Sequence, residues 1–160
     1  MPDRPAPAAE DGRVLALRRY TAGLLKLART YRRAVNRRLE EHGISDARAL
    51  PVLQVARAGG GMRQGALAEE LGIEGPSLVR LLDQICAAGL IERREDPSDR
   101  RAKTLHPTPA GLVLAATLEE LLNGLRAQLM AGVSDDDLAA ALRVFDALDM
   151  AVEARLADGG

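Results

Sequence analysis

Cysteine, tryptophan and long apolar runs are scarce or missing in this sequence. It has one cysteine, Cys86, no tryptophan, and three aromatic side chains, Tyr20, Tyr31 and Phe145. A single thiol excludes an internal disulfide framework, and no apolar run approaches the roughly 18 residues that a transmembrane helix needs. The first residues also lack the apolar core of a signal peptide. We therefore expect a cytoplasmic protein that makes no contact with a membrane.

The rest of the composition favours one mostly α domain. The chain has 160 residues, of which 47% are hydrophobic, which is enough for one domain with a substantial core and too little for two. Leucine, alanine, arginine and the acids are abundant, a balance typical of packed helices. Residues 1–12 contain three prolines and show no periodicity. We predict a disordered arm there and a single domain over residues 13–160.

Charge is distributed unevenly, although the net charge is only −1. Residues 13–63 hold twelve Lys or Arg against three acids, whereas residues 110–160 hold three against nine. A basic third is compatible with a polyanionic partner, but such a run is more often a solvated helix face. Charge alone therefore assigns no partner.

The N-terminal third is predicted to be one long amphipathic helix. Apolar residues recur at steps of three and four from Val14 to about Glu41, and Gly43 ends the helix. The apolar stripe consists of Leu17, Tyr20, Leu24, Leu27, Tyr31, Val35 and Leu39.

Two further amphipathic helices are predicted after the central region. Thr108 as N-cap and Pro109 in the first turn open one of them, which ends at Gly132. Ser134 caps the last helix, and the acids at 135–137 favour its positive end. The two stripes are Leu114, Leu118, Leu121, Leu125 and Leu129, and Leu138, Leu142, Phe145, Leu148, Val152 and Leu156.

One protomer cannot readily bury all of these stripes. The economical arrangement is an isologous homodimer in which the terminal helices of two copies pack together. The alternative is a monomer whose terminal helices fold back onto its own core.

The central region is predicted to contain a helix-turn-helix. One helix covers about Asp46–Ala58 and ends at three successive glycines. Two short helices follow near Gln64–Leu71 and Gly75–Ala88, joined by a tight turn at Gly72, and Gly89 closes the second as a left-handed cap. Their predicted core residues are Leu67, Ala68 and Leu71, and Leu78, Val79, Leu82 and Ile85.

A charged hairpin is predicted next, in the stretch ERREDPSDRRAK, with its tip at residues 96–99. Pro107 has no N–H for a strand ladder, so we expect the second strand to be short. No Ser or Thr precedes the first short helix, which leaves its cap to Gln64 or to backbone groups. Residues 63–111 are thus predicted to form a winged helix-turn-helix.

The outward face of the second short helix carries side chains suited to reading DNA. Ser77, Arg80 and Gln84, with Leu81 beside them, share one side of that helix. An α-helix fits the major groove, where Arg can donate two parallel hydrogen bonds to guanine and Gln can pair with adenine. Arg80 is therefore our first candidate for base reading. An ordinary exposed helix face is the alternative for this helix taken alone.

The hairpin strengthens the DNA-binding interpretation. Arg100 and Arg101 at its tip suit the minor groove, whose negative potential attracts guanidinium groups. Asp99 beside them can hold an arginine in one rotamer before DNA arrives. Which arginine enters the groove stays open, and a solvated loop is the alternative. The candidates for phosphate contacts are Arg93, Arg94 and Lys103.

The run from Gly72 to Gly111, which contains PSLVR and SDRRAK, resembles the DNA-binding core of the MarR/SlyA family of winged helix-turn-helix transcription regulators. The chain length and the flanking helices agree with that family over about residues 14–156. The resemblance implies dimerisation helices at 13–45 and 110–160 and a DNA-binding lobe at 46–109. It also assigns Pro76, Ser77 and Arg80 to the recognition helix and residues 99–101 to the wing tip.

The resemblance further implies a homodimeric repressor that binds a pseudo-palindromic site in double-stranded DNA. Many family members are released from DNA by small aromatic acids or by other phenolic or lipophilic effectors, which bind between the dimerisation helices and the DNA-binding lobe. In this chain such a cleft would involve the first two helices.

Cys86 and the acids at 135–137 each have a second possible role. Cys86 could sense oxidants, but its place among Leu82, Ile85 and Leu90 favours packing with a raised pKa. The acids at 135–137 could hold a metal, although capping and the helix dipole already account for them.

No enzyme chemistry is predicted. His42 and His106 have no ligand or catalytic cluster around them, so we predict no catalytic residue, no metal and no cofactor. The main alternative to a DNA reader is a winged-helix protein-interaction module, which would favour apolar residues where this chain has Ser77, Arg80 and Gln84.

Overall fold

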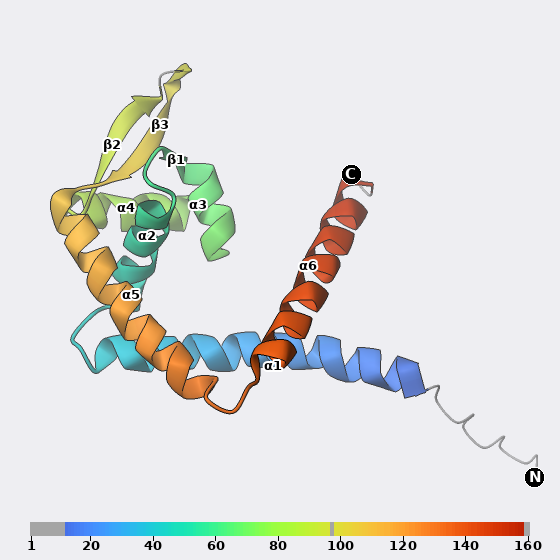
Figure 1. The fold of residues 1–160 in the computed structure, drawn as a ribbon. Helices are drawn as coiled ribbons and strands as arrows, with labels where there is room; N and C mark the ends of the chain where they lie inside the picture. The colour runs from blue at the N-terminus through green and yellow to red at the C-terminus, as the bar shows by residue number, and fades with distance from the viewer. Residues whose placement is uncertain (1–11, 97, 159–160) are drawn as a thin grey trace, which may run out of the picture. The chain divides into compact units, whose positions relative to one another are not determined.

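The computed structural model describes residues 12–96 and 98–158, without the side chains of Arg100 and Arg101. The predicted arm lies outside the described residues except for Gly12, which begins the first helix. Figure 1 shows helices with a small β-sheet, which confirms the mostly α class with a β-wing. The elements are α1 (Gly12–Glu40), α2 (Asp46–Arg57), β1 (Met62–Arg63), α3 (Gln64–Leu71), α4 (Gly75–Ala87), β2 (Ile91–Asp96), β3 (Asp99–Pro107), α5 (Pro109–Leu129) and α6 (Asp135–Ala157).

The chain divides into two compact units, one ending at Leu122 and the other beginning at Asn123. The core of the first unit gathers aliphatic side chains from α2, α3, α4 and the sheet. Burial of each such side chain contributes roughly 1.5–3 kcal/mol before conformational entropy is subtracted. The buried members are Val52, Val55, Leu67, Leu78, Leu82, Ile85, Ile91 and Leu105.

The helix-turn-helix forms where the glycine pattern predicts it. Gly72 has φ 62° and Gly89 has φ 69°, both in the left-handed region that glycine reaches without steric cost. The amide of Leu90 then donates to the carbonyl of Ile85 at 3.2 Å, and Leu90 packs partly against the core. These turns set the start and end of α4.

Two burial predictions on α4 were wrong. Val79 was expected in the core but is 40% exposed, and Leu81 was expected on the outward face but packs partly against the core. Successive helical residues lie about 100° apart. The core side of α4 is centred between Leu78 and Ile85, so it takes in Leu81 and leaves Val79 outside.

The sheet is antiparallel with strand order β1-β3-β2. β1 was not predicted; it pairs Met62 with Leu105 and Arg63 with Thr104. The expectation of a short second wing strand was wrong, because β3 runs from Asp99 through Pro107, which faces Ile91. Beyond Leu105 the strand has β2 as its one neighbour, so a residue without an N–H removes at most one ladder bond there.

The base of the hairpin is joined tightly to α5. The Thr108 hydroxyl donates to the carbonyl of Gly89 at 2.6 Å and accepts from the amide of Gly111 at 3.0 Å, which makes Thr108 the predicted cap. A Cβ on Gly111 would collide with the backbone carbonyl of Leu90. A residue without a side chain is therefore required in the first turn of α5.

Of the two caps expected before α3, Gln64 is not the one used. The N-cap residue is Arg63, and it makes no side-chain capping hydrogen bond, which agrees with the backbone alternative. The backbone of Arg63 is already held by its pairing with Thr104 in the sheet, which replaces a side-chain cap in fixing where the helix starts.

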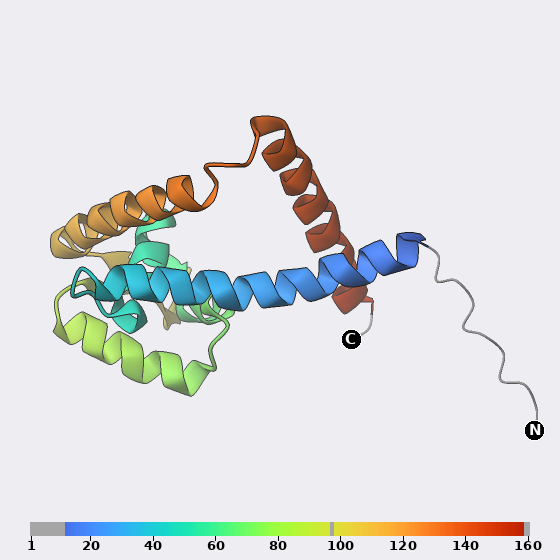
Figure 2. The same ribbon diagram turned by 90° about the horizontal axis from the view of Figure 1, so that it is seen from below.

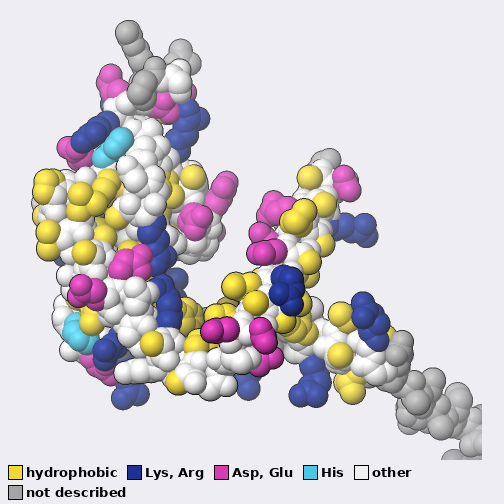
Figure 3. Space-filling model, in the orientation of Figure 1, with side chains coloured by type: hydrophobic (Ala, Val, Ile, Leu, Met, Phe, Trp, Pro, Cys, Tyr) yellow, Lys and Arg dark blue, Asp and Glu magenta, His cyan; other side chains and the backbone are white. Residues whose placement is uncertain are grey.

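The long terminal helices expose apolar side chains. In α1, which Figure 2 shows as one uninterrupted helix, only Val35 and Leu39 are buried. In the second unit α6 is capped by Ser134, whose hydroxyl accepts from the amide of Asp137 at 3.1 Å, and it buries no residue. Figure 3 shows hydrophobic side chains on the surface of α6. The exposed stripe residues are Leu17, Tyr20, Leu27, Tyr31, Leu138, Leu142, Phe145, Val152 and Leu156.

Candidate nucleic-acid interface

The outward face of α4 presents the predicted recognition side chains. Ser77, Arg80 and Gln84 are all exposed, and Pro76 lies in the first turn of the helix. Pro76, Ser77 and Arg80 line a hollow of about 190 Å³. Within the described residues the guanidinium group of Arg80 has no hydrogen-bond or ion-pair partner. Its donors are thus available to an acceptor that approaches this face.

An acid that was not predicted from the sequence lies on the same face. Asp83 is exposed, and Arg93 of β2 donates to its carboxylate at 2.6 Å. The negative charge of Asp83 would repel a phosphate or a hydrogen-bond acceptor on a base. Its pairing with Arg93 partly neutralises that negative charge. Arg93 is therefore held against α4 in the structure, in addition to its predicted role with phosphates.

The other predicted phosphate contacts also have carboxylate partners. Arg94 donates to Glu92 through Nε at 2.8 Å, and the Lys103 ammonium lies 3.3 Å from Glu95. Exposed pairs of this kind contribute about 0.2–1 kcal/mol. A phosphate can therefore displace the carboxylate at small cost.

The wing tip is only partly described. Asp99, Arg100 and Arg101 lie at the start of β3, so the predicted triplet is at the tip of the hairpin. The side chains of Arg100 and Arg101 are outside the described part, and so is Pro97. The exposed Asp99 is opposite Asp96 in the register, next to a shift between Glu95 and Asp96.

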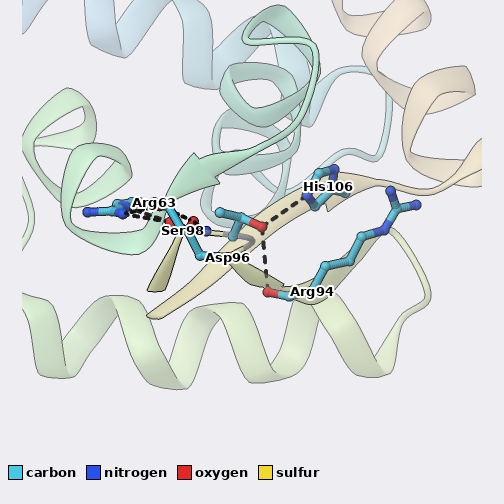
Figure 4. Close-up of polar contacts among 6 residues, drawn as sticks. Arg63, Arg94, Asp96, Ser98 and His106 are labelled. Atoms are coloured by element: carbon cyan, nitrogen blue, oxygen red, sulfur yellow. Dashed lines mark hydrogen bonds and ion pairs between the residues drawn. The ribbon is translucent and has the colours of Figure 1, made fainter. Parts of the chain in front are cut away.

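The side chain of Asp96 in the wing accepts four hydrogen bonds from Ser98 and Arg63 (Figure 4). Its Oδ1 accepts from the amide of Ser98 at 2.9 Å and from the Ser98 hydroxyl at 2.6 Å. Its Oδ2 accepts from Nε and Nη2 of Arg63 at 2.9 and 2.7 Å. These bonds, first those from Ser98 and then those from Arg63, hold the pKa of the Asp96 carboxyl well below its ordinary value. Asp96 is therefore ionised throughout the physiological range.

A second polar contact lies along β3. The Thr104 hydroxyl is 3.0 Å from Nε2 of His106 and 3.5 Å from the carbonyl of Arg94. Figure 4 marks these contacts of His106 and Arg94 with dashed lines. These contacts satisfy a largely buried hydroxyl in the middle strand of the sheet. His106 thus has a local structural partner.

An open pocket of about 260 Å³ lies between α2 and α5 in the first unit. Its charged lining residues are Arg57 and Glu119, which pair through Nε at 2.6 Å and Nη2 at 3.1 Å. The hydrogen bond to Glu119 raises the pKa of Arg57. The remaining lining residues are Leu53, Ala56, Leu112, Ala115 and Ala116.

Cys86 is half-buried and packs partly against the core of the first unit. Burial raises the pKa of its thiol, an effect that nearby Arg93 opposes. A thiol in this state is a weak nucleophile near neutral pH, which agrees with the packing interpretation.

In residues 12–96 and 98–158, no three His, Cys, Asp or Glu side chains come together in a way that could hold a metal ion. Within the same ranges, no helix has the length and apolar character to cross a bilayer.

Comparison with known proteins identifies the family. A family model described as MarR family matches residues 42–102. A solved structure described as the transcriptional regulator PA3341 is 34% identical, with a TM-score of 0.77, and the match covers 84% of this chain and 98% of that one. The chain belongs to the MarR family.

More distant MarR structures share the fold. A MarR family regulator named SP03579 is 24% identical with a TM-score of 0.72, covering 92% of this chain and 97% of that one. A MarR variant from E. coli, solved in complex with operator DNA, is 19% identical with a TM-score of 0.66, covering 88% of this chain and 99% of that one. The winged-helix fold of this MarR-family chain is thereby confirmed.

The sequence did not predict the residues whose roles depend on the strand register of this MarR-family wing. Arg63 and Asp96 are 33 positions apart, and Asp83 and Arg93 meet only because β2 lies beside α4. The one local signal was the sequence Asp96-Pro97-Ser98, in which an Asp two residues before a Ser favours an Asx turn.

Proposed function

We propose that this MarR-family chain is a homodimeric, sequence-specific regulator of transcription that binds a pseudo-palindromic site in double-stranded DNA. The observation that carries the proposal is the outward face of α4, where Ser77, Arg80 and Gln84 are exposed together. α4 would lie in the major groove, with Arg80 reading a guanine and Gln84 an adenine. An interaction module would instead favour apolar side chains on this face.

The wing supplies the flanking contacts in this proposal. Arg100 or Arg101 would enter the minor groove, where negative potential is concentrated, and Asp99 would hold an arginine ready. Phosphates would take Arg93, Arg94 and Lys103 from their present carboxylate partners. A MarR variant from E. coli with the same fold was solved in complex with operator DNA, which supports DNA binding by this chain.

The proposed partner of the terminal helices is a second copy of this chain. The stripe residues Leu27 of α1 and Leu142 and Phe145 of α6 are about half exposed or more, which is unusual for one apolar face of a soluble protomer. α1 is strongly basic and α6 mainly acidic, so the two helices are electrostatically suited to meet across a dimer interface. Two copies would place two recognition helices on a two-fold-related site.

We also propose that the protein is a repressor released by a small aromatic acid. The pocket between α2 and α5 supports this, because its lining is apolar apart from Arg57 and Glu119, and a carboxylate ligand could replace Glu119 as the partner of Arg57. Benzoate should bind the wild type and release it from DNA, and Arg57→Ala should abolish both effects. If benzoate and a set of larger aromatic acids leave DNA binding unchanged, the effector proposal is wrong and the DNA-reading proposal is unaffected.

The direct test of DNA reading is selection of bound sequences from a random duplex pool at physiological salt. The wild type is run in parallel with the double variant Arg100→Ala, Arg101→Ala. We expect the wild type to enrich a motif with two-fold symmetry and the variant to lose or degrade its flanks. If the wild type enriches no motif, DNA reading is rejected and the interaction module becomes the leading interpretation.

A further inference from the structure

The brace at the wing tip consists of Arg63, Asp96 and Ser98, and it connects two elements that belong to the proposed DNA interface. Asp96 and Ser98 are at the tip of the hairpin, whereas Arg63 is in β1 and is the N-cap residue of α3. Four donated hydrogen bonds converge on the Asp96 carboxylate, two on each oxygen. Figure 4 shows the guanidinium of Arg63 directed at Asp96 beside Ser98.

The brace is more buried and makes more hydrogen bonds than an ordinary surface ion pair. The Asp96 side chain is 9% exposed although it lies near the end of a hairpin, and that of Arg63 is 57% exposed. Charge-assisted hydrogen bonds of 2.6 to 2.9 Å to both oxygens fix the carboxylate in one orientation. The bonds from Ser98 close the turn locally, and the bonds from Arg63 tie that turn to the start of α3.

We propose that Asp96, held by Arg63, is a positioning residue for DNA binding: it fixes the wing tip so that Arg100 and Arg101 extend from a preorganised backbone. This inference rests on the proposed function and deepens it. A tip that is ordered before DNA arrives loses less conformational freedom on binding, so more of the contact energy is realised as affinity. The brace also keeps the wing in register with the helix-turn-helix.

For Asp96→Ala, the brace and simple electrostatics predict opposite changes in DNA affinity. Asp96→Ala removes one negative charge, which by itself should strengthen binding to a polyanion. Loss of the brace should weaken binding by about three- to tenfold, the cost expected for ordering a long side chain or a short turn on binding. Glu41→Ala is the matched control, because Glu41 pairs with Arg37 and Arg38. It changes the net charge by the same amount outside the wing.

The experiment is a double-mutant cycle on the duplex recovered by the selection above, measured by fluorescence anisotropy. Asp96→Ala is made in the wild type and in the Arg100→Ala, Arg101→Ala variant. We expect the three- to tenfold loss in the wild type, no further loss in the variant that lacks both arginines, and no loss for Glu41→Ala. Asp96→Asn, which can still accept from Ser98 but has no charge for Arg63, should fall in between.

Two results of the cycle would overturn the inference. An affinity that rises as much for Asp96→Ala as for Glu41→Ala would mean that charge alone matters. An equal loss with and without the two arginines would mean that Asp96 supports the fold in general rather than the wing arginines. Urea unfolding of each variant shows whether a loss of affinity comes from a destabilised fold or from a wing tip that is no longer held in place.

A second measurement keeps the brace testable if the wild type proves to bind no DNA sequence. The amide of Ser98 should exchange slowly with solvent in the wild type and quickly in Asp96→Ala, since Asp96 is its acceptor. Equal exchange rates in both proteins would reject the brace itself. Slow exchange in the wild type without any enriched motif would reject the DNA-reading function and, with it, the positioning role.

Discussion

Arg80 is the residue at which base reading can be separated from general attraction to DNA. Its guanidinium is exposed on α4 and has no partner among the described residues. Arg80→Ala should cost about 1–3 kcal/mol at the selected site and relax the base preference at one position of each half-site, because a bidentate contact to guanine is lost. Anisotropy titrations on the selected duplex and on point-substituted versions of it measure both effects.

Lys103→Ala is the comparison for Arg80→Ala. Lys103 is on β3, pairs with Glu95, and is a proposed phosphate contact. Its removal should weaken binding to all duplexes alike and reduce the salt dependence. If Arg80→Ala instead lowers affinity equally for the selected and for random DNA, Arg80 contacts phosphate and another residue reads the bases.

At the residue scale, periodicity predicted most of the core and missed the charges that meet across elements. Leu78, Leu82 and Ile85 were placed correctly, because helical spacing alone determines which of them share a face. Val79 was misplaced by its apolar character. The pairing of Asp96 with Arg63 depends on the register of a three-stranded sheet, which residue spacing within one segment does not contain.

At the scale of elements, the residues at turns and caps were sufficient to predict where helices begin and end. The left-handed glycines at 72 and 89 and the caps Thr108 and Ser134 act through local backbone geometry, so the sequence around them was sufficient. β1 has two residues and owes its existence to β3, which lies more than 40 positions later in the chain. A strand of that length has no periodicity from which it could be predicted.

The junction between the wing and α5 can be tested at Gly111. Its Cβ position is occupied by the carbonyl of Leu90, so Gly111→Ala should destabilise the fold by about 1–3 kcal/mol through forced backbone movement. Gly65→Ala is the matched control, because Gly65 is also helical and has open space around its Cβ position. That change should be neutral or stabilise by up to about 1 kcal/mol. Urea unfolding at one protomer concentration measures both, and equal effects would mean that the junction relaxes freely.

At the scale of the whole molecule, the sequence predicted more apolar helix surface than one copy of the chain buries. The long helices formed as their apolar spacing required, yet α6 buries none of its residues and α1 buries only Val35 and Leu39. Periodicity identifies an apolar face but does not state what covers it. Burial against a second copy would remove these faces from water, and the opposite charges of α1 and α6 would favour their meeting.

The dimer proposal is tested with two variants of α6, one with a new charge on the apolar stripe and one with a new charge outside it. Phe145 lies on the stripe and is 47% exposed, whereas Met150 is 74% exposed and lies about 140° further round the helix. Phe145→Asp should convert the dimer to monomer, because an unpaired carboxylate would be buried at the interface. Met150→Asp, with the same change of charge, should remain dimeric. Sedimentation equilibrium gives the mass of each. Dimerisation of both variants would mean that another surface makes the interface, and a monomeric wild type would reject the two-fold-related DNA site as well.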